Sequence, residues 1–161
     1  MEKFIFTGDI HLPVQQIDLY EWFLGITEND YKKFSKAHIA VGLTRIDGVE
    51  SMVNVESIGG NLLVQHYQLQ QKQKDLLLLC SPKSEAFLFH LVKVNVGVEW
   101  KMTVKEKDAL NSYFICEISV KYPNKLLKLA SILVAGNYFL QKHVNEEGPL
   151  FARNIEEKFS R

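Results

Sequence analysis

The sequence has few of the residues that mark specialised classes of protein. It contains only two cysteines among 161 residues, Cys80 and Cys116, and they do not form a CxxC motif. This usage excludes a disulfide scaffold and is typical of buried, inert thiols in a reducing compartment. The most apolar stretch, residues 126–140, is interrupted by polar residues such as Lys128 and Asn137, so it is too short and too polar to cross a bilayer.

Charge of one sign is also lacking. Nineteen basic residues balance nineteen acidic ones, and the formal net charge is zero. This balance argues against a nucleic-acid-binding protein and against a polybasic membrane-surface protein. With 47% hydrophobic and 24% charged residues, the chain has the composition of a globular protein. Since there is no linker, repeat or apolar leader, we expect one cytoplasmic domain over residues 1–161.

The first forty residues predict one strand followed by two helices. Residues 3–11 are rich in β-branched and aromatic side chains, which is typical of a strand. Apolar residues recur at helical intervals over 14–24, and Gly25 is a common helix terminator. A second short helix is expected from Thr27 to about residue 37.

The middle of the chain predicts an antiparallel sheet. We expect strands over 51–58, 62–70 and 74–80, with the last one closed by Ser81-Pro82. Apolar and polar residues alternate almost perfectly over 92–104.

Thirteen residues of strand would extend roughly 43 Å, which is long for this domain, so we predict a turn or sharp bend near residues 95–97. Residues 113–122 form the last predicted strand, with Phe114 and Cys116 on the same side.

A long helix is predicted to begin at Pro123-Asn124 and to kink or restart at Gly148-Pro149. The order of elements predicts an α+β fold in which a curved antiparallel sheet wraps around the C-terminal helix. Such a sheet, closed by a helix, commonly leaves an apolar cavity between the two.

The segment after residue 142 offers the clearest chemistry. On a helix, His143 and Glu147 would lie on one face and could bind one ion, with Glu146 as the alternative partner. Imidazole nitrogen and carboxylate oxygen are both good zinc ligands. The same spacing also occurs on many solvated helix faces, so this pair alone leaves both interpretations open.

Other ionisable residues have a structural and a functional interpretation. His38 follows a helix, where its protonated form would interact well with the helix dipole. Glu56 shares a strand face with Asn54, and that face is either wet or concave. His90 and His66 are in phase with apolar neighbours, so each is expected to face inward, as a core histidine or as an acid–base group.

Four stretches carry a resemblance to a known superfamily: residues 31–38, 55–60, the predicted bend at Gly97, and 143–148. Together with the order of elements, they resemble the START/Bet v 1-like (SRPBCC, helix-grip) superfamily. Within it they are similar to a bacterial branch, the zinc-dependent diacetylphloroglucinol and phloretin hydrolases, which cleave a carbon–carbon bond between an aromatic ring and an acyl group.

The resemblance implies a zinc site with four protein ligands, His38, Glu56, His143 and Glu147. It also implies that Tyr31 matches a catalytic tyrosine upstream of the first ligand.

Three hypotheses follow. The first is a zinc-dependent hydrolase or lyase that acts on a small aromatic or polyketide-like ketone, with Tyr31 or His90 assisting proton transfer. The second is a non-catalytic binder of a small apolar or aromatic ligand. The third is a metal-free cyclase or dehydratase that uses His90 or His66 with Tyr67. The sequence leaves the substrate open, as well as the choice between a monomer and a homodimer.

Overall fold

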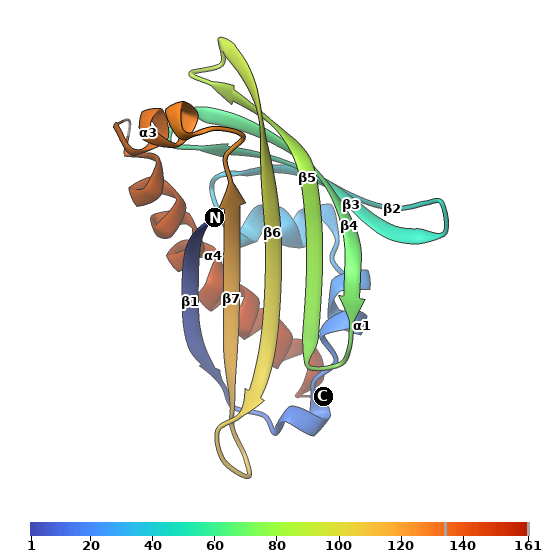
Figure 1. Ribbon diagram of the computed structural model, residues 1–161. Helices are drawn as coiled ribbons and strands as arrows, with labels where there is room; N and C mark the ends of the chain where they lie inside the picture. Colours follow the sequence, from blue (N-terminus) through green and yellow to red (C-terminus); the bar gives the residue numbers. More distant parts are fainter. Residues whose placement is uncertain (134, 161) are drawn as a thin grey trace.

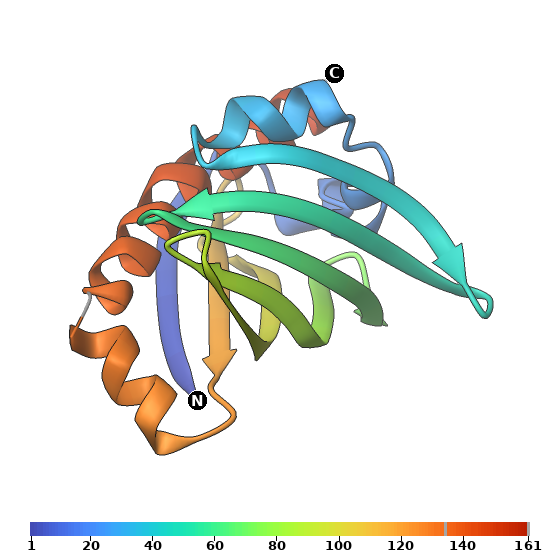
Figure 2. The same ribbon diagram turned by 90° about the horizontal axis from the view of Figure 1, so that it is seen from above.

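The computed structural model describes residues 1–133 and 135–160. Its centre is a seven-stranded sheet in the order β1-β7-β6-β5-β4-β3-β2, in which every neighbouring pair is antiparallel. The sheet curves around the long helix α4 (Gly136–Phe159), as Figures 1 and 2 show, and this confirms the predicted fold class. The strands are β1 (Glu2–Ile10), β2 (His38–Ile46), β3 (Val49–Ile58), β4 (Asn61–Lys72), β5 (Leu76–Leu88), β6 (Val92–Glu106) and β7 (Ser112–Lys121).

Short helices fill the connection between β1 and β2. The single helix predicted over 14–24 is divided into a 3-10 turn η1 (Val14–Gln16) and α1 (Leu19–Leu24). A capping box then starts α2 (Glu28–Phe34), because the Thr27 side chain accepts from the Asp30 backbone N–H and the Asp30 side chain accepts from the Thr27 N–H.

The predicted C-terminal helix is also divided, into α3 (Lys125–Leu133) and α4, and Val134 between them lies outside the described residues. Of the kink or restart predicted at Gly148-Pro149, the restart is wrong, since α4 continues through Pro149 to Phe159. The kink stays a prediction. Along the described chain, no helix is both long enough and apolar enough to span a membrane.

The sheet differs from the prediction in three places. Strand β2 was not predicted, β5 continues through Ser81-Pro82, and β6 runs without a turn over 15 residues. The register between β5 and β6 shifts between Ser81 and Ser84, where β5 carries a β-bulge opposite the middle of β6. A bulge bends and twists its strand, so a long β6 fits a curved sheet without the predicted turn.

Two halves of α4 cover different parts of the concave sheet. The C-terminal half packs on an aromatic core, in which Phe151 lies 5.6 Å from Trp22, 4.8 Å from Phe34 and 5.5 Å from Trp100, measured between ring centroids. The N-terminal half covers a cavity. His143 lies between these two regions, and it lines the cavity together with Glu147 of the same helix.

Candidate metal centre

Four ionisable side chains from three elements meet beneath α4. The β2–β3 register places His38 opposite Glu56, and one turn of α4 places His143 above Glu147. All four residues are buried, with exposed fractions between 4% and 7%. We call this group, His38, Glu56, His143 and Glu147, the His/Glu centre.

The Nε2 atoms of both histidines face the two carboxylates. His38 Nε2 lies 3.1 Å from Glu147 Oε2 and 3.7 Å from Glu56 Oε1. His143 Nε2 lies 3.4 Å from Glu147 Oε2 and 3.9 Å from Glu56 Oε2. Ligand atoms of His38, Glu56 and His143 all lie within 4.8 Å of one another, so this buried group could hold a metal ion.

The other ring nitrogen of each histidine has a partner that orients the ring. His38 Nδ1 lies 2.7 Å from the Tyr31 backbone carbonyl, and His143 Nδ1 lies 3.3 Å from Ser35 Oγ. A carbonyl only accepts, so Nδ1 of His38 must donate its proton, and the lone pair of Nε2 is left for a cation when the ring is neutral. The Tyr31 ring also stacks on the His38 ring at 3.9 Å.

Glu56 is held by a buried polar network. The Tyr31 hydroxyl donates to Glu56 Oε1, and Asn54 Nδ2 donates to the same carboxylate oxygen at 2.8 Å and to the Tyr31 hydroxyl at 2.7 Å. Burial and the negative charge of Glu56 raise the pKa of Tyr31 well above its ordinary value. The Tyr31 hydroxyl therefore keeps its proton at neutral pH.

The electrostatics of the centre favour a positive charge. Burial alone would lower the pKa of His38, but its hydrogen bond to Glu147 and the charges of Glu56 and Glu147 raise that pKa overall. Two buried carboxylates are costly without a compensating charge, which a proton on His38 or a divalent cation can supply. Two imidazoles and two carboxylates suit zinc or a similar divalent metal, so the residues fit the predicted ion.

The structure does not bring all the predicted residues to this centre. Glu146 points away and is exposed, where its carboxylate accepts from the Lys36 backbone N–H at 3.0 Å. His90 was expected to face inward, and this is wrong: it is exposed in the β5–β6 turn, with a positive φ of 60°.

The expected phase of β4 is also wrong. His66 is exposed, while Gln65 and Tyr67 face inward and line the cavity. The stretch 62–64 is apolar on both faces, so the alternation did not define which face is buried. The prediction that His66 faces inward was therefore wrong because the strand phase was shifted by one residue.

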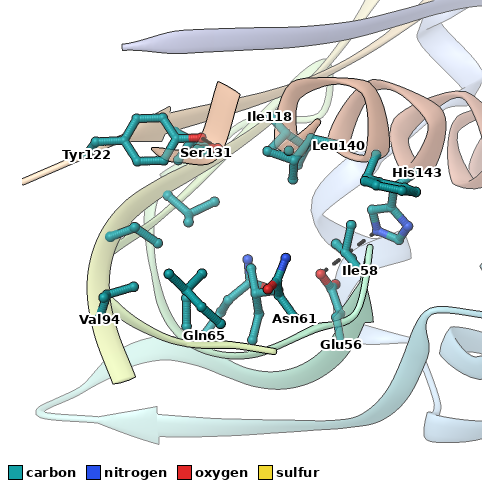
Figure 3. A pocket seen from close by; sticks show the side chains of 18 of the residues that line it. Glu56, Ile58, Asn61, Gln65, Val94, Ile118, Tyr122, Ser131, Leu140 and His143 are labelled. Carbon is teal, nitrogen blue, oxygen red and sulfur yellow. Dashed lines mark hydrogen bonds and ion pairs between the residues drawn. The ribbon is translucent and has the colours of Figure 1, made fainter. Parts of the chain in front are cut away.

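A cavity of about 200 Å³ opens beside the His/Glu centre. Tyr31, Glu56, His143 and Glu147 lie at one end of it, and Figure 3 shows Glu56 and His143 facing each other there. The rest of the wall is mostly apolar and comes from the sheet and from both C-terminal helices, including Ile58, Leu63, Val94, Val96, Val98, Trp100, Ile118, Val120, Leu127, Phe139 and Leu140.

Sequence reasoning missed two residues that position the centre. Asn54 was noticed only as a polar neighbour of Glu56, and its role as a donor to Glu56 was not predicted. Ser35 was not considered, and because its partner His143 is far away along the chain, no local pattern in the sequence could have indicated this contact.

Comparison with known proteins shows the fold. No protein-family model matches the sequence, and no curated protein matches it. Solved structures do match over nearly the whole chain. A START superfamily protein from Mycobacterium smegmatis has a TM-score of 0.55 and 10% identity, and the match covers 98% of this chain and 97% of that one.

Two further solved structures also match over nearly the whole chain. The Zhui aromatase/cyclase from Streptomyces sp. R1128 has a TM-score of 0.60 and 8% identity, with 99% of this chain and 94% of that one covered. The protein TTHA0849 from Thermus thermophilus has a TM-score of 0.69 and 8% identity, with 98% and 99% covered. The chain therefore has the helix-grip fold of START/Bet v 1-like proteins.

Proposed function

We propose that this protein is a zinc-dependent hydrolase or lyase that acts on a small aromatic or polyketide-like ketone. The observation that carries the proposal is the position of the His/Glu centre at the end of an apolar cavity. A ligand with an apolar body could occupy the cavity, while its carbonyl group would reach the centre. The resemblance to zinc-dependent carbon–carbon hydrolases supports the same chemistry.

The His/Glu centre would hold the ion through His38 Nε2, His143 Nε2 and the carboxylates of Glu56 and Glu147. A zinc ion bound there would supply a Lewis acid for a ketone carbonyl. The protein's own contribution is a dry site, two oriented imidazoles and two carboxylates that accept hydrogen bonds.

Tyr31 is the proposed proton donor. In hydrolysis of an aryl ketone, water adds to the carbonyl carbon, the bond from ring to acyl carbon breaks, and the ring carbon keeps the electron pair and takes a proton. The products are an acid and the deacylated ring. Because the hydroxyl of Tyr31 stays protonated and borders the cavity, it is placed to give that proton, which the water would then restore.

A cyclase or a ligand carrier is the second candidate. The match to an aromatase/cyclase and the apolar cavity favour it. A metal-free cyclase that uses His90 or His66 has little support, since both side chains are exposed and only Tyr67 of the proposed group lines the cavity. A carrier would need no zinc and no proton donor.

Zinc content separates these functions. Protein purified without chelator should contain nearly one zinc per chain, and chelator should lower its melting temperature by roughly 5–10 °C, as expected for removal of a ligand present at about 100 times its dissociation constant. Glu147→Gln should lose most of the zinc. Glu146→Gln, which changes the exposed neighbour, should retain it. A metal-free protein whose melting is unchanged by chelator would contradict the proposal.

We further propose that residues 1–161 form one domain, since α4 packs along β1 near the other end of the chain. The cytoplasmic location stays a prediction from the sequence, and the choice between a monomer and a homodimer stays open.

A further inference from the structure

Two buried amides in the cavity wall, Asn54 and Gln65, each have a side-chain oxygen with no hydrogen-bond partner among the described residues. Gln65 faces inward from β4 and is only 4% exposed. Within residues 1–133 and 135–160, its Oε1 atom has no hydrogen-bond partner. Buried amide groups are almost always paired, because an unpaired one loses its hydration without compensation. An unpaired glutamine in an apolar wall therefore calls for a functional explanation.

Asn54 is already held through its Nδ2 atom, which donates to Glu56 and to the Tyr31 hydroxyl, whereas no hydrogen bond within the described residues holds the Gln65 side chain. Further polar side chains on the wall also have partners. Asn61 Oδ1 accepts from the Phe89 backbone N–H at 3.0 Å, and the hydroxyls of Tyr122 and Ser131 lie 2.8 Å apart. Figure 3 shows Gln65 on the sheet side of the cavity, across from Leu140 of α4. Asn54 is the polar neighbour of Gln65 across the strand pair, and a ligand in the cavity would lie against Gln65.

The strand register fixes where Gln65 lies relative to the His/Glu centre. Asn54 pairs with Gln65 across β3 and β4, and Glu56 pairs with Leu63. Gln65 is therefore the diagonal neighbour of Glu56, at a spacing of about 7–8 Å along the sheet. One substituted aromatic ring bridges such a spacing, with a carbonyl at one end and a ring substituent at the other.

We propose that Gln65 determines specificity by binding a hydroxyl group on the ligand's ring, away from the ketone. An amide offers both a donor and an acceptor, and a hydroxyl group can satisfy both. A site built to bind a hydroxyl rejects the analogue that lacks it, because the polar group is then left unpaired. This inference rests on the proposed function in one respect only, namely that the ligand carries a ketone that lies at the His/Glu centre.

Ligand binding tests the inference without any turnover. The probes are phenyl methyl ketone and its meta- and para-hydroxy derivatives, and the readout is the fluorescence of Trp100, which lines the cavity. The wild-type protein should bind at least one hydroxylated ketone about tenfold more tightly than the parent, as one hydrogen bond to a buried amide predicts. Gln65→Leu should abolish this preference by weakening the hydroxylated ligand. Gln70→Leu, an exposed position on the same strand, should keep it.

Stability distinguishes ligand binding from a structural role. Gln65→Leu removes an unpaired buried group, so its melting temperature should be unchanged or a few degrees higher, with zinc content as in the wild type. A lower melting temperature together with loss of zinc would overturn the inference, since Gln65 would then support Asn54 and, through it, Glu56. Equal affinity for all probes, or no binding of any, would also overturn it. Because the probes are titrated both with zinc and with chelator, a failure of the zinc proposal leaves the preference for a hydroxyl measurable.

Discussion

The contact that fixes α4 against the sheet provides a quantitative test of how the His/Glu centre is held. Gly148 directly follows Glu147 and packs on Phe6 of β1. A Cβ atom added at Gly148 would overlap Cγ and Cδ1 of Phe6 and would stand 2.9 Å from its Cβ. These atoms belong to the base of the Phe6 side chain, which cannot turn away by a small rotation. Gly148→Ala therefore forces α4 away from β1.

Two opposing effects determine how much Gly148→Ala changes the free energy of unfolding. Overpacking in a well-packed interior costs about 1–3 kcal/mol, and replacing glycine by alanine inside a helix recovers up to about 1 kcal/mol. We expect a net loss of about 1–2 kcal/mol, which corresponds to a melting temperature lower by roughly 2–8 °C in a chain of this size. Since Glu147 is the preceding residue, zinc affinity should fall by about tenfold or more.

Gly42→Ala is the matched control. Gly42 lies in β2, and an added Cβ would meet nothing within 4 Å. Its melting temperature should be unchanged or slightly raised, because alanine loses less backbone entropy than glycine on folding. Thermal unfolding by circular dichroism and zinc titration against a competing chelator measure both effects. If Gly148→Ala matches the control in stability and in zinc affinity, the contact with Phe6 does not position the centre.

Three other substitutions test the proton donor, the aromatic core and a surface ion pair. Tyr31→Phe should retain zinc but lower kcat by roughly 10²–10⁴-fold on an aryl ketone that the wild type hydrolyses; an unchanged kcat would exclude Tyr31 as proton donor. Phe151→Ala should destabilise the protein by about 3–5 kcal/mol in urea unfolding, and a loss below ~1 kcal/mol would contradict the packing described. The hydrogen bond from Arg45, together with smaller contributions, lowers the pKa of Glu50 to about 2 from 4.5. The stabilisation that the ionised Glu50 carboxylate gives to the folded protein is thus present above pH 4.5 and lost as the pH falls toward 2. The difference in melting temperature between wild type and Glu50→Gln should therefore shrink over that range. A constant difference would refute the pairing of Glu50 with Arg45.

The fold was predictable where one face of an element is uniformly apolar. The alternation over 92–104 indicated the buried face of β6 correctly, with Val96, Val98 and Trp100 inside. Strand β2 was missed because it lies at the edge of the sheet and is largely exposed, so it carries little alternation. The uninterrupted β6 could not be derived from its own residues, since its curvature depends on a bulge in the neighbouring β5.

The candidate site was predictable from a different kind of signal. The helical spacing of His143 and Glu147 suggested one face, and the resemblance to zinc hydrolases added His38 and Glu56. The structure brings these four together. Strand phase alone failed for His66 and for His90: residues 62–64 are apolar on both faces, and a tight turn exposes His90. The supporting contacts from Asn54 and Ser35 depend on tertiary packing and left no periodic trace in the sequence.

Anomalous scattering at the zinc edge, from crystals of protein purified without chelator, tests directly whether the His/Glu centre binds zinc. A zinc-dependent enzyme should give a single strong peak per chain, within about 2.0–2.2 Å of His38 Nε2, His143 Nε2 and oxygen atoms of Glu56 and Glu147. Absence of a peak between these side chains, or zinc found only at exposed histidines such as His11, would contradict zinc binding at the His/Glu centre.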